Sequence, residues 1–309
     1  MRYGRLDLVR CVAISLLLTA HIGQRIKSPL GEFFGLPDFY YVSLGGIAVT
    51  IFLILSGMVL ELQYGNKDIR PSQFIVKRIL RIYPVYYLSL LFGIVVFAIR
   101  SYYETGHVLT NFSAFNIGDV ILSLTAGYAF VGEWGGPFVK TSWFIPLIMT
   151  LYVFFPFLSR EIKKRPIVSV IIVLMISSLT RLIVGHYDVL PKRPLDWFPF
   201  CRVFEFSLGI FLAIYVPKEL FRFSKSSKRF RSIVTFLSAL SFPLFLVHHP
   251  ILFIINDLTD HGVSQWISIC SYVSISLLVS WIILAIDKKI PRSRILEALG
   301  AISDGNGMG

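Results

Sequence analysis

Apolar segments long enough to cross a lipid bilayer recur along the whole chain, and they constrain its fold more than any other feature. A transmembrane helix needs about 20 consecutive residues that are mostly apolar. Because 55% of the 309 residues are hydrophobic and 16% are charged, these segments do not fit inside one water-soluble core. The sequence therefore predicts an all-α polytopic integral membrane protein.

Eight of these segments are predicted to be full transmembrane helices, at 6–27, 41–62, 79–99, 143–160, 167–185, 198–216, 233–255 and 265–286. The interval 101–142 is polar except for one apolar run at 117–131, which is short for a crossing, so we expect a re-entrant or interfacial segment there. We expect a single transmembrane domain over 1–290. Residues 291–309 are expected to form a short cytoplasmic tail with a disordered, Gly-rich end.

The basic residues indicate how the spans are oriented. Cytoplasmic loops of membrane proteins carry an excess of Lys and Arg. With both termini cytoplasmic, eight crossings place the basic clusters at 67–81, 217–231 and 288–294 on that side. These loops account for the net charge of +12, so no nucleic-acid partner is predicted, and the expected partner is the lipid bilayer.

The three cysteines do not indicate a metal or disulfide site. Cys11, Cys201 and Cys270 lie far apart, each within a predicted span, and lack the spacing of metal ligands. We expect them to be small core residues. The chain also has no internal repeat and no Walker-type or dinucleotide-binding glycine loop.

The first span carries charge at one end and a histidine deep inside. Asp7, Arg10 and His21 are expected on one helix face, because eleven residues at about 100° each return His21 to the face of Arg10, roughly 16 Å along the axis. An ionisable residue inside a span is costly to keep and by default marks a function. The alternative is an arginine that reaches the headgroups and a histidine that only packs.

The ends of the second and third spans hold three further candidates. Arg78 and Arg81 open the third span, where they are either ligands for an anion or ordinary residues of a cytoplasmic loop. Glu61 ends the second span and is interpreted as a supporting residue, an interfacial partner for a basic side chain.

Two groups of residues are assigned packing roles. Ser56 and Gly57 are expected to let neighbouring helices approach closely, and not to supply a nucleophile. Tyr83, Tyr86 and Tyr87 fit an aromatic belt at the membrane surface.

The later spans contain three supporting candidates. Arg202 and Glu205 are i and i+3 on one helix face and are expected to neutralise each other, as charges inside a membrane usually must. His248 is predicted to lie deep in its span, close to Pro250. It is either a residue of the acceptor path or a hydrogen-bonded packing residue near a proline kink.

Five motifs occur in the following order along the chain. They are Arg5-x-Asp7-x-x-Arg10 with His21, Phe52-Leu53-Ile54-Leu55-Ser56-Gly57, Lys77-Arg78-x-x-Arg81-Ile82-Tyr83-Pro84-x-Tyr86-Tyr87, Arg202-x-x-Glu205-Phe206-x-Leu208-Gly209 and Ser241-Phe242-Pro243-Leu244-Phe245-Leu246-Val247-His248-His249-Pro250. Together the five motifs resemble membrane-bound acyltransferase family 3. The resemblance extends from residue 5 to residue 250, nearly the whole chain.

The resemblance implies a membrane O-acyltransferase of the bacterial cytoplasmic (inner) membrane. The implied donor is cytoplasmic acetyl-CoA or another short acyl-CoA. The implied acceptor is a hydroxyl of a cell-surface or exported glycan, or of a lipid-linked sugar. No metal is implied.

The resemblance also implies that Arg10, His21, Arg78 and Arg81 are the functional core. The unperturbed pKa of histidine is about 6.5, which makes it a natural base near neutral pH. In this hypothesis His21 accepts the proton of the acceptor hydroxyl, or is itself acylated and relays the group across the membrane. Arg10 guides the donor or counters its pyrophosphate, and Arg78 and Arg81 bind its phosphates through planar guanidinium groups.

The chain departs from the family pattern in two respects. Many relatives carry a glutamate where this chain has Ile148, in Trp143-Phe144-Ile145-Pro146-Leu147-Ile148, so no site residue is transferred to that position. Relatives also tend to have more helices and sometimes an appended extracytoplasmic domain, which leaves the handling of the acceptor open.

Two hypotheses from other functional classes stand beside the enzyme. A transporter or flippase for a lipid-linked sugar would use the buried Arg, Glu and His side chains as a substrate or proton path, but the sequence lacks the paired repeats with broken helices that such proteins often have. A non-catalytic membrane sensor would need a soluble output domain, and none is recognisable in the sequence.

Overall fold

The fold is a bundle of helices with one short hairpin. The computed structural model describes residues 3–36, 40–67, 70–108, 110–131, 133–187, 190, 194–223 and 226–299. Within these residues, strands β1 (Phe34–Leu36) and β2 (Tyr40–Val42) pair antiparallel and every other regular element is helical. The predicted tail end, 300–309, lies outside the described residues.

Eight helices in the described parts of the chain are long and apolar enough to cross a membrane, which confirms the predicted polytopic all-α fold. The spans are α1 (Gly4–Arg25), α2 (Leu44–Tyr64), α3 (Pro71–Thr105), α5 (Phe144–Lys164), α6 (Pro166–Tyr187), α8 (Pro199–Tyr215), α9 (Lys228–Val247) and α11 (Gln265–Asp287). The shorter helices are α4 (Ile117–Thr125), α7 (Pro194–Trp197), α10 (Ile254–Asp260) and α12 (Arg292–Ala298).

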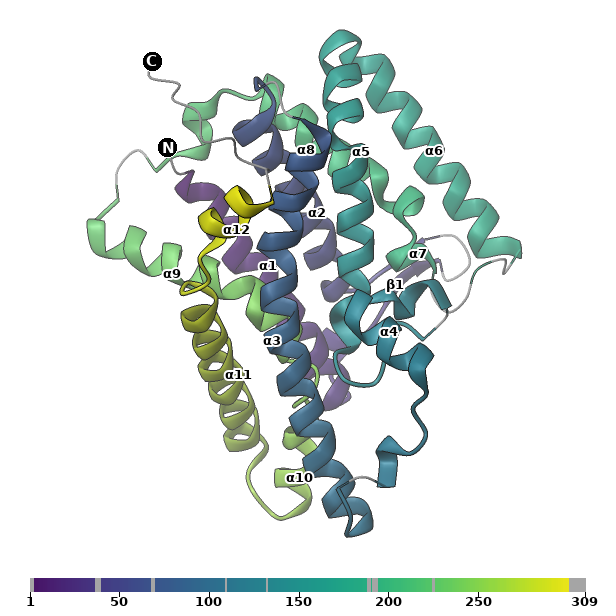
Figure 1. The fold of residues 1–309 in the computed structure, drawn as a ribbon, viewed down its shortest axis with the longest axis vertical. Coiled ribbons are helices and arrows are strands. Elements are labelled where there is room, and N and C mark those ends of the chain that lie inside the picture. The colour runs from purple at the N-terminus through teal and green to yellow at the C-terminus, as the bar shows by residue number, and fades with distance from the viewer. Residues whose placement is uncertain are drawn as a thin grey trace.

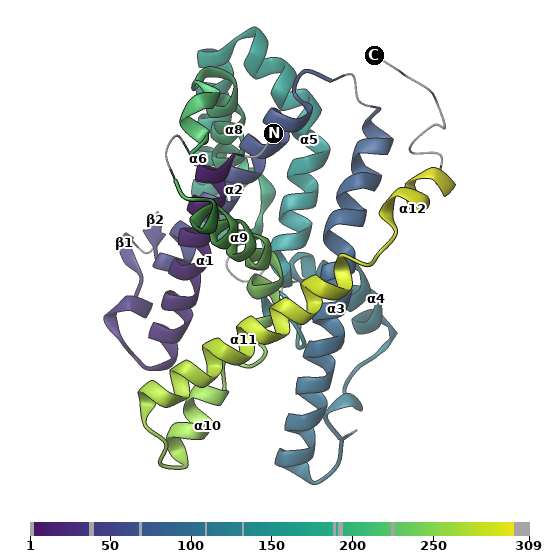
Figure 2. The same ribbon diagram turned by 90° about the vertical axis from the view of Figure 1, so that its left-hand side faces the viewer.

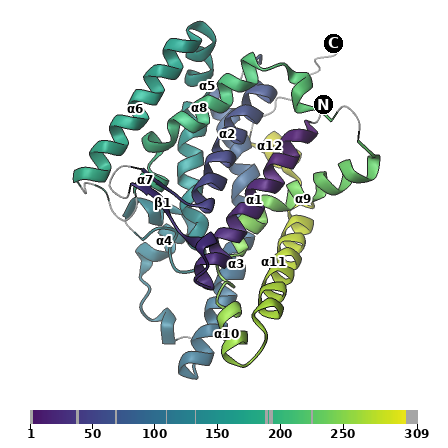
Figure 3. The same ribbon diagram turned by 180° about the vertical axis from the view of Figure 1, so that it is seen from behind.

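The spans pack in an order that differs from their order in the sequence. α2 packs against both α1 and α8, α6 covers α8, and α9 joins α1 to α11. Figure 1 shows α6 at one edge of the molecule, and Figure 3 shows α1 between α2 and α9. In Figure 2, α11 crosses α3 obliquely and connects α10 to α12. Spans from both ends of the sequence therefore meet around the centre of the bundle.

The third span begins earlier than predicted. Helix α3 starts at Pro71, whose fixed φ suits the first helical position, and not at residue 79. The first turns of α3 are helical, but they contain polar and charged residues, so hydropathy alone does not predict them as part of a span. Arg78 and Arg81 therefore lie two to three turns inside a helix and not at its start.

The seventh span ends earlier than predicted. Helix α9 stops at Val247, and residues 248–253 form turns before α10 begins. The reason is Pro250, which lacks a backbone N–H and disfavours helical geometry at His249. His248 is thus the C-cap residue of α9, and the prediction that it lies deep in a span is wrong.

Helices α2 and α8 approach closely at two glycines. A Cβ atom added to Gly57 would lie 2.0 Å from the carbonyl oxygen of Phe206, and one added to Gly209 would lie 2.0 Å from that of Ile54. No larger residue fits without moving a backbone. The close approach predicted at Gly57 is confirmed, and the contact fixes the position of α2 next to the centre of the bundle.

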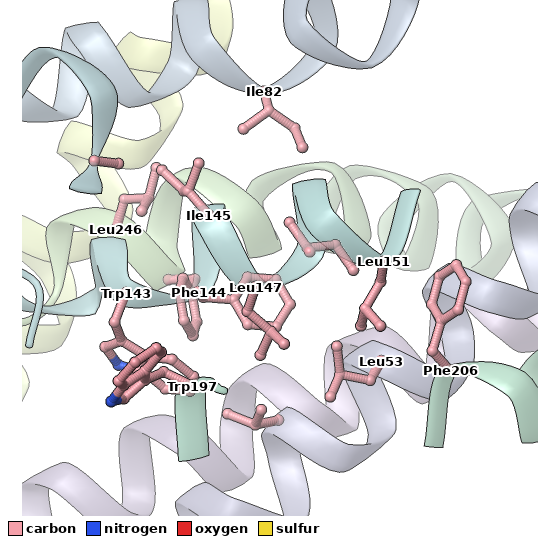
Figure 4. Close-up of a cluster of buried hydrophobic side chains, with 14 of the residues drawn as sticks. Leu53, Ile82, Trp143, Phe144, Ile145, Leu147, Leu151, Trp197, Phe206 and Leu246 are labelled. Atoms are coloured by element: carbon pink, nitrogen blue, oxygen red, sulfur yellow. The ribbon is translucent and has the colours of Figure 1, made fainter. Parts of the chain in front are cut away.

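The apolar core surrounds α5. Ile145, Leu147 and Leu151 have no exposed surface. They belong to the same buried cluster as Leu53 of α2 and Phe206 of α8 (Figure 4). The outward face of α6 is instead covered by exposed apolar side chains, as expected for a helix in contact with lipid.

Among its described residues, the polar interval 101–142 adds no further span between α3 and α5. Its apolar run forms the nine-residue helix α4 followed by a 3₁₀ turn, Gly127–Val131, which is too short to cross a bilayer.

Three tyrosine hydroxyls of α3 hold the end of α4. Tyr83 and Tyr87 donate to the carbonyls of Thr125 and Leu124, each at 3.1 Å, and Tyr86 donates to that of Ser123. These are the last carbonyls of α4, which have no partner within the helix. The tyrosines predicted to form an aromatic belt thus cap another helix.

Candidate active site

A cavity of about 540 Å³ lies among six spans, α1, α2, α3, α5, α9 and α11. Helix α2 gives it one continuous wall, because residues 52, 56, 59, 60 and 63 share a helix face. From Phe52 to Gln63 this wall is roughly 16 Å long, at about 1.5 Å per residue. The cavity is therefore long enough to differ in character between its two ends.

One end of the cavity is charged and reaches solvent. Arg78, Arg81 and Gln63 line it, and both Arg81 and Gln63 are exposed residues. The other end is apolar and closed, because Phe144, Ile148 and other buried residues line it. The charged end suits an anionic group, and the closed end suits an apolar one.

Aromatic neighbours fix the position of Arg78. Its guanidinium donates to the hydroxyl of Tyr64 at 2.7 Å. It also lies over the rings of Tyr64 and Phe74, 5.0 and 5.5 Å from the ring centroids. Arg78 is thus held in one orientation on the cavity wall, which an ordinary loop arginine would not be.

Arg10 lines the same cavity and is held between two spans. It pairs with Asp7 at 3.3 Å and donates to the hydroxyl of Ser238 in α9 at 3.1 Å. Ser238 in turn donates to Asp7 at 2.9 Å. The predicted pairing of Asp7 with Arg10 is present, and Asp7 supports Arg10 from the same helix face.

His21 does not line the cavity. Its ring lies 5.1 Å from that of His248 and 5.7 Å from that of His249, centroid to centroid, and its Nδ1 is 3.2 Å from Gln24 Oε1. Arg10 and His21 both face α9, as a shared helix face requires. The structure therefore places the histidine beyond the closed end of the cavity.

Phe245 lies between the cavity and the histidines. It lines the closed end, and its ring centroid is 6.3 Å from that of His248. His248 is fully buried, and its Nδ1 is 3.1 Å from the carbonyl oxygen of Leu244. One phenyl ring thus separates the cavity from the histidine cluster of His21, His248 and His249.

Glu61 lies outside the cavity wall and ties α2 to α5. Its carboxylate pairs with Lys163 at 2.8 Å and accepts a hydrogen bond from Ser159 at 2.6 Å. This agrees with the interpretation of Glu61 as the partner of a basic side chain. The pair holds the end of α2, near Gln63, against α5.

Arg202 and Glu205 also lie away from the main cavity. They pair at 3.2 Å as predicted, and Glu205 additionally pairs with Arg181 of α6 at 3.0 Å. Arg202 donates to Thr50 of α2 at 3.1 Å. This buried cluster joins α2, α6 and α8, and Glu205 and Arg181 line a second cavity of about 350 Å³.

Several site residues were not singled out from the sequence. Arg181 had a visible signal, since it is a charge inside the predicted span 167–185. Ser238 and Tyr152, which both line the main cavity, had none, because serines and tyrosines are common in spans. Asp287 lines the charged end of the cavity and pairs with Arg292, a contact that links α11 to the start of α12.

Among the described residues, the cysteines and the other metal-ligating side chains do not form a further site. Cys201 is buried, whereas Cys270 is exposed on α11, so the prediction of a core position is wrong for Cys270. All three cysteines are free thiols. Across the described part of the chain, no group of three or more His, Cys, Asp or Glu side chains is arranged to hold a metal ion.

Comparison with known proteins gives a family match. Residues 3–227 match a family model described as an acyltransferase domain. The chain is 25% identical over 248 residues to acyltransferase MdmB of Streptomyces mycarofaciens, covering 72% of this chain and 59% of that protein. It is 26% identical over 223 residues to an O-acetyl transferase of Shigella phage Sf6, covering 68% and 62%. The chain thus spans about three fifths of the length of these relatives, and no solved structure matches it.

Proposed function

The chain belongs to acyltransferase family 3, whose model matches residues 3–227, and from this premise we propose that it is a membrane O-acyltransferase. The proposed donor is acetyl-CoA or another short acyl-CoA. The proposed acceptor is a hydroxyl of a glycan or of a lipid-linked sugar, and the proposed location is the bacterial cytoplasmic membrane. Both relatives are named for acyl transfer, which favours this function over a transporter.

The observation that carries the proposal is the polarity of the main cavity. An acyl-CoA has an anionic nucleotide at one end and a neutral acyl thioester at the other. The cavity has the same order, with Arg78 and Arg81 at its solvent-exposed end and buried aromatic side chains at its closed end. Guanidinium groups bind phosphate oxygens through paired hydrogen bonds, so the arginines would hold the nucleotide.

Arg10 would hold the donor further along the cavity. It stands on the cavity wall, fixed by Asp7 and Ser238, and so offers a positive charge inside the bundle. With the nucleotide at Arg78 and Arg81, the acyl end would lie against Phe245, the ring that adjoins the histidine cluster.

His21 would move the proton once the ring of Phe245, which lies between the cavity and the histidine cluster, has turned aside. A thioester is already activated, so the reaction needs a base for the acceptor hydroxyl. In the tautomer with its proton on Nδ1, His21 donates to Gln24 Oε1, and Nε2 is then the basic nitrogen. The hydroxyl oxygen attacks the thioester carbonyl carbon while its proton passes to His21. The C–S bond then breaks, and CoA leaves as a thiolate that takes up the proton.

Relay through the histidine is the second route. His21 itself attacks the thioester carbonyl, CoA leaves, and the acyl-imidazole then reacts with the acceptor hydroxyl. This route would let a donor on one side of the membrane serve an acceptor on the other. It differs from direct transfer in leaving acyl label on the protein.

The test uses the purified protein in lipid with labelled acetyl-CoA and with glucose as a probe that supplies acceptor hydroxyls. We expect consumption of the thioester by the intact protein and its loss in His21→Ala and Arg10→Ala. The matched controls are His186→Ala and Arg229→Ala, which change exposed residues outside the cavity and should behave like the intact protein. Equal consumption by all five proteins would defeat the proposal. Label retained on the intact protein, and lost with His21, would favour the relay.

A further inference from the structure

The closed end of the cavity is built from apolar side chains of four helices. Phe52, Phe144 and Phe245 come from α2, α5 and α9, and Ile148 and Val85 from α5 and α3 lie beside them on the cavity wall. The ring of Phe245 packs against those of Phe144 and Phe52, at 5.2 and 6.1 Å between centroids. Ile148 is 1% exposed and Phe245 is 3% exposed, so this end is closed to water.

The charges of the cavity lie towards its other end. Ser238, which holds Arg10, precedes Phe245 by seven residues on α9, roughly 10 Å along the helix. Side chains on a helix tilt towards its N-terminus, so Arg81 leans away from Val85. A group that enters the closed end therefore contacts phenyl rings and aliphatic side chains. The guanidinium groups lie nearer the open end of the cavity.

We propose, as an extension of the proposed function, that this closed end is an acyl pocket that selects a short, uncharged acyl group, and that Phe245 limits the length of that group. A carboxylate at the end of the acyl chain would be buried among apolar side chains without a cation to pair with, which strongly disfavours binding. Acetyl and other short saturated acyl groups fit. Dicarboxylic groups such as succinyl are excluded.

Phe245 sets the length because it closes the pocket towards the histidines. Its ring lies on the cavity wall on one side and 6.3 Å from the ring of His248 on the other. A longer acyl chain would occupy the space of this ring. Replacement by alanine would extend the pocket towards the histidine cluster, so that longer chains would fit.

The test measures binding of four non-hydrolysable thioether analogues of acyl-CoA to the full chain in lipid nanodiscs. The analogues carry acetyl, butyryl, succinyl or octanoyl. Butyryl and succinyl have chains of the same carbon number and differ in the terminal carboxylate, so they separate charge from length. For the intact protein we expect acetyl and butyryl to bind with similar Kd. We expect succinyl and octanoyl to bind at least about tenfold more weakly.

Two variants separate the two parts of the inference. Phe245→Ala should strengthen octanoyl binding relative to acetyl by about tenfold and leave the penalty on succinyl in place. Ile148→Lys, which adds a cation to the pocket, should reduce the penalty on succinyl. The matched control is Phe236→Ala, an exposed phenylalanine on the same helix, which should leave every ratio unchanged.

The outcomes distinguish this inference from the function on which it rests. Equal Kd values for butyryl and succinyl in the intact protein would overturn the charge selection even while acyl-CoA binds. An octanoyl to acetyl ratio that is the same in Phe245→Ala and in Phe236→Ala would overturn the role of Phe245. Failure of all four analogues to bind the intact protein would overturn the proposed donor and the acyl pocket together.

Discussion

His21 of α1 and His248 at the end of α9 face each other with their ring centroids 5.1 Å apart. The same two helices meet again at Arg10 and Ser238, on the wall of the cavity. One helix interface thus carries both the proposed base and a proposed donor-binding arginine. The interface joins the first span to the seventh, so the site depends on contacts between distant parts of the sequence.

Ser238→Ala is expected to weaken donor binding. The hydroxyl of Ser238 bonds to both Arg10 and Asp7, and hydrogen bonds to charged groups contribute about 1.5–3 kcal/mol. We expect the Kd of an acetyl-CoA analogue to rise about tenfold, measured by calorimetry on the protein in nanodiscs. Ser280→Ala, on a buried serine that donates to the carbonyl of Ser276 within α11, is the control. Equal Kd values for the two variants would show that Ser238 does not contribute to donor binding.

Arg78→Lys is expected to reduce affinity although it keeps the charge. Lysine lacks the planar fork that donates to Tyr64 and lies over the rings of Tyr64 and Phe74. A rise in Kd for CoA of about tenfold should follow, with Arg160→Lys, an exposed arginine of α5, unchanged. If Arg78→Lys binds CoA as tightly as the intact protein, Arg78 supplies only net charge.

Gly57→Ala is expected to lower thermal stability. The added methyl group would lie 2.0 Å from the carbonyl oxygen of Phe206, so α2 and α8 must separate. Overpacking of this kind costs about 1–3 kcal/mol. The measurement is Tm in detergent, compared with Gly45→Ala, where the nearest atom would lie at an ordinary 3.5 Å. A Tm for Gly57→Ala that equals that of the control would contradict the close packing of these helices.

Glu205→Gln is expected to destabilise the fold more than a surface substitution of the same kind. It leaves the buried Arg202 beside a neutral amide and removes the carboxylate that pairs with Arg181. Breaking a buried ion pair costs about 3–5 kcal/mol. Glu104→Gln breaks an exposed pair with Arg100, where about 1 kcal/mol or less is expected. Unfolding of both variants at the same denaturant concentration would show that the buried cluster adds little to the free energy of unfolding.

Contacts within one helix could be predicted from the sequence. Asp7 and Arg10, and Arg202 and Glu205, are three residues apart, and helical geometry alone brings such pairs together. The number of spans could be predicted as well, because a bilayer demands long apolar runs. Both predictions rest on local regularities.

Contacts between helices could not be predicted. Ser238 is 231 residues from Asp7, and Ser159 is 98 residues from Glu61, so no spacing rule relates them. The start of α3 differs from the prediction for a different reason. Hydropathy marks where a helix enters lipid, whereas α3 begins at Pro71, two turns before its apolar part. The separation of His21 from the cavity could not be predicted either, because Phe245, which lies between them, is one phenylalanine among 27 in the sequence.

The three tyrosines that cap α4 also couple the movement of α4 to that of α3. Because the terminal carbonyls of α4 take their hydrogen bonds from α3, this short helix is fastened to α3 at its C-terminal end. The same α3 carries Arg78 and Arg81 two to three turns from its start. A tilt of α3 that widened the arginine-lined mouth would therefore displace α4 at the same time.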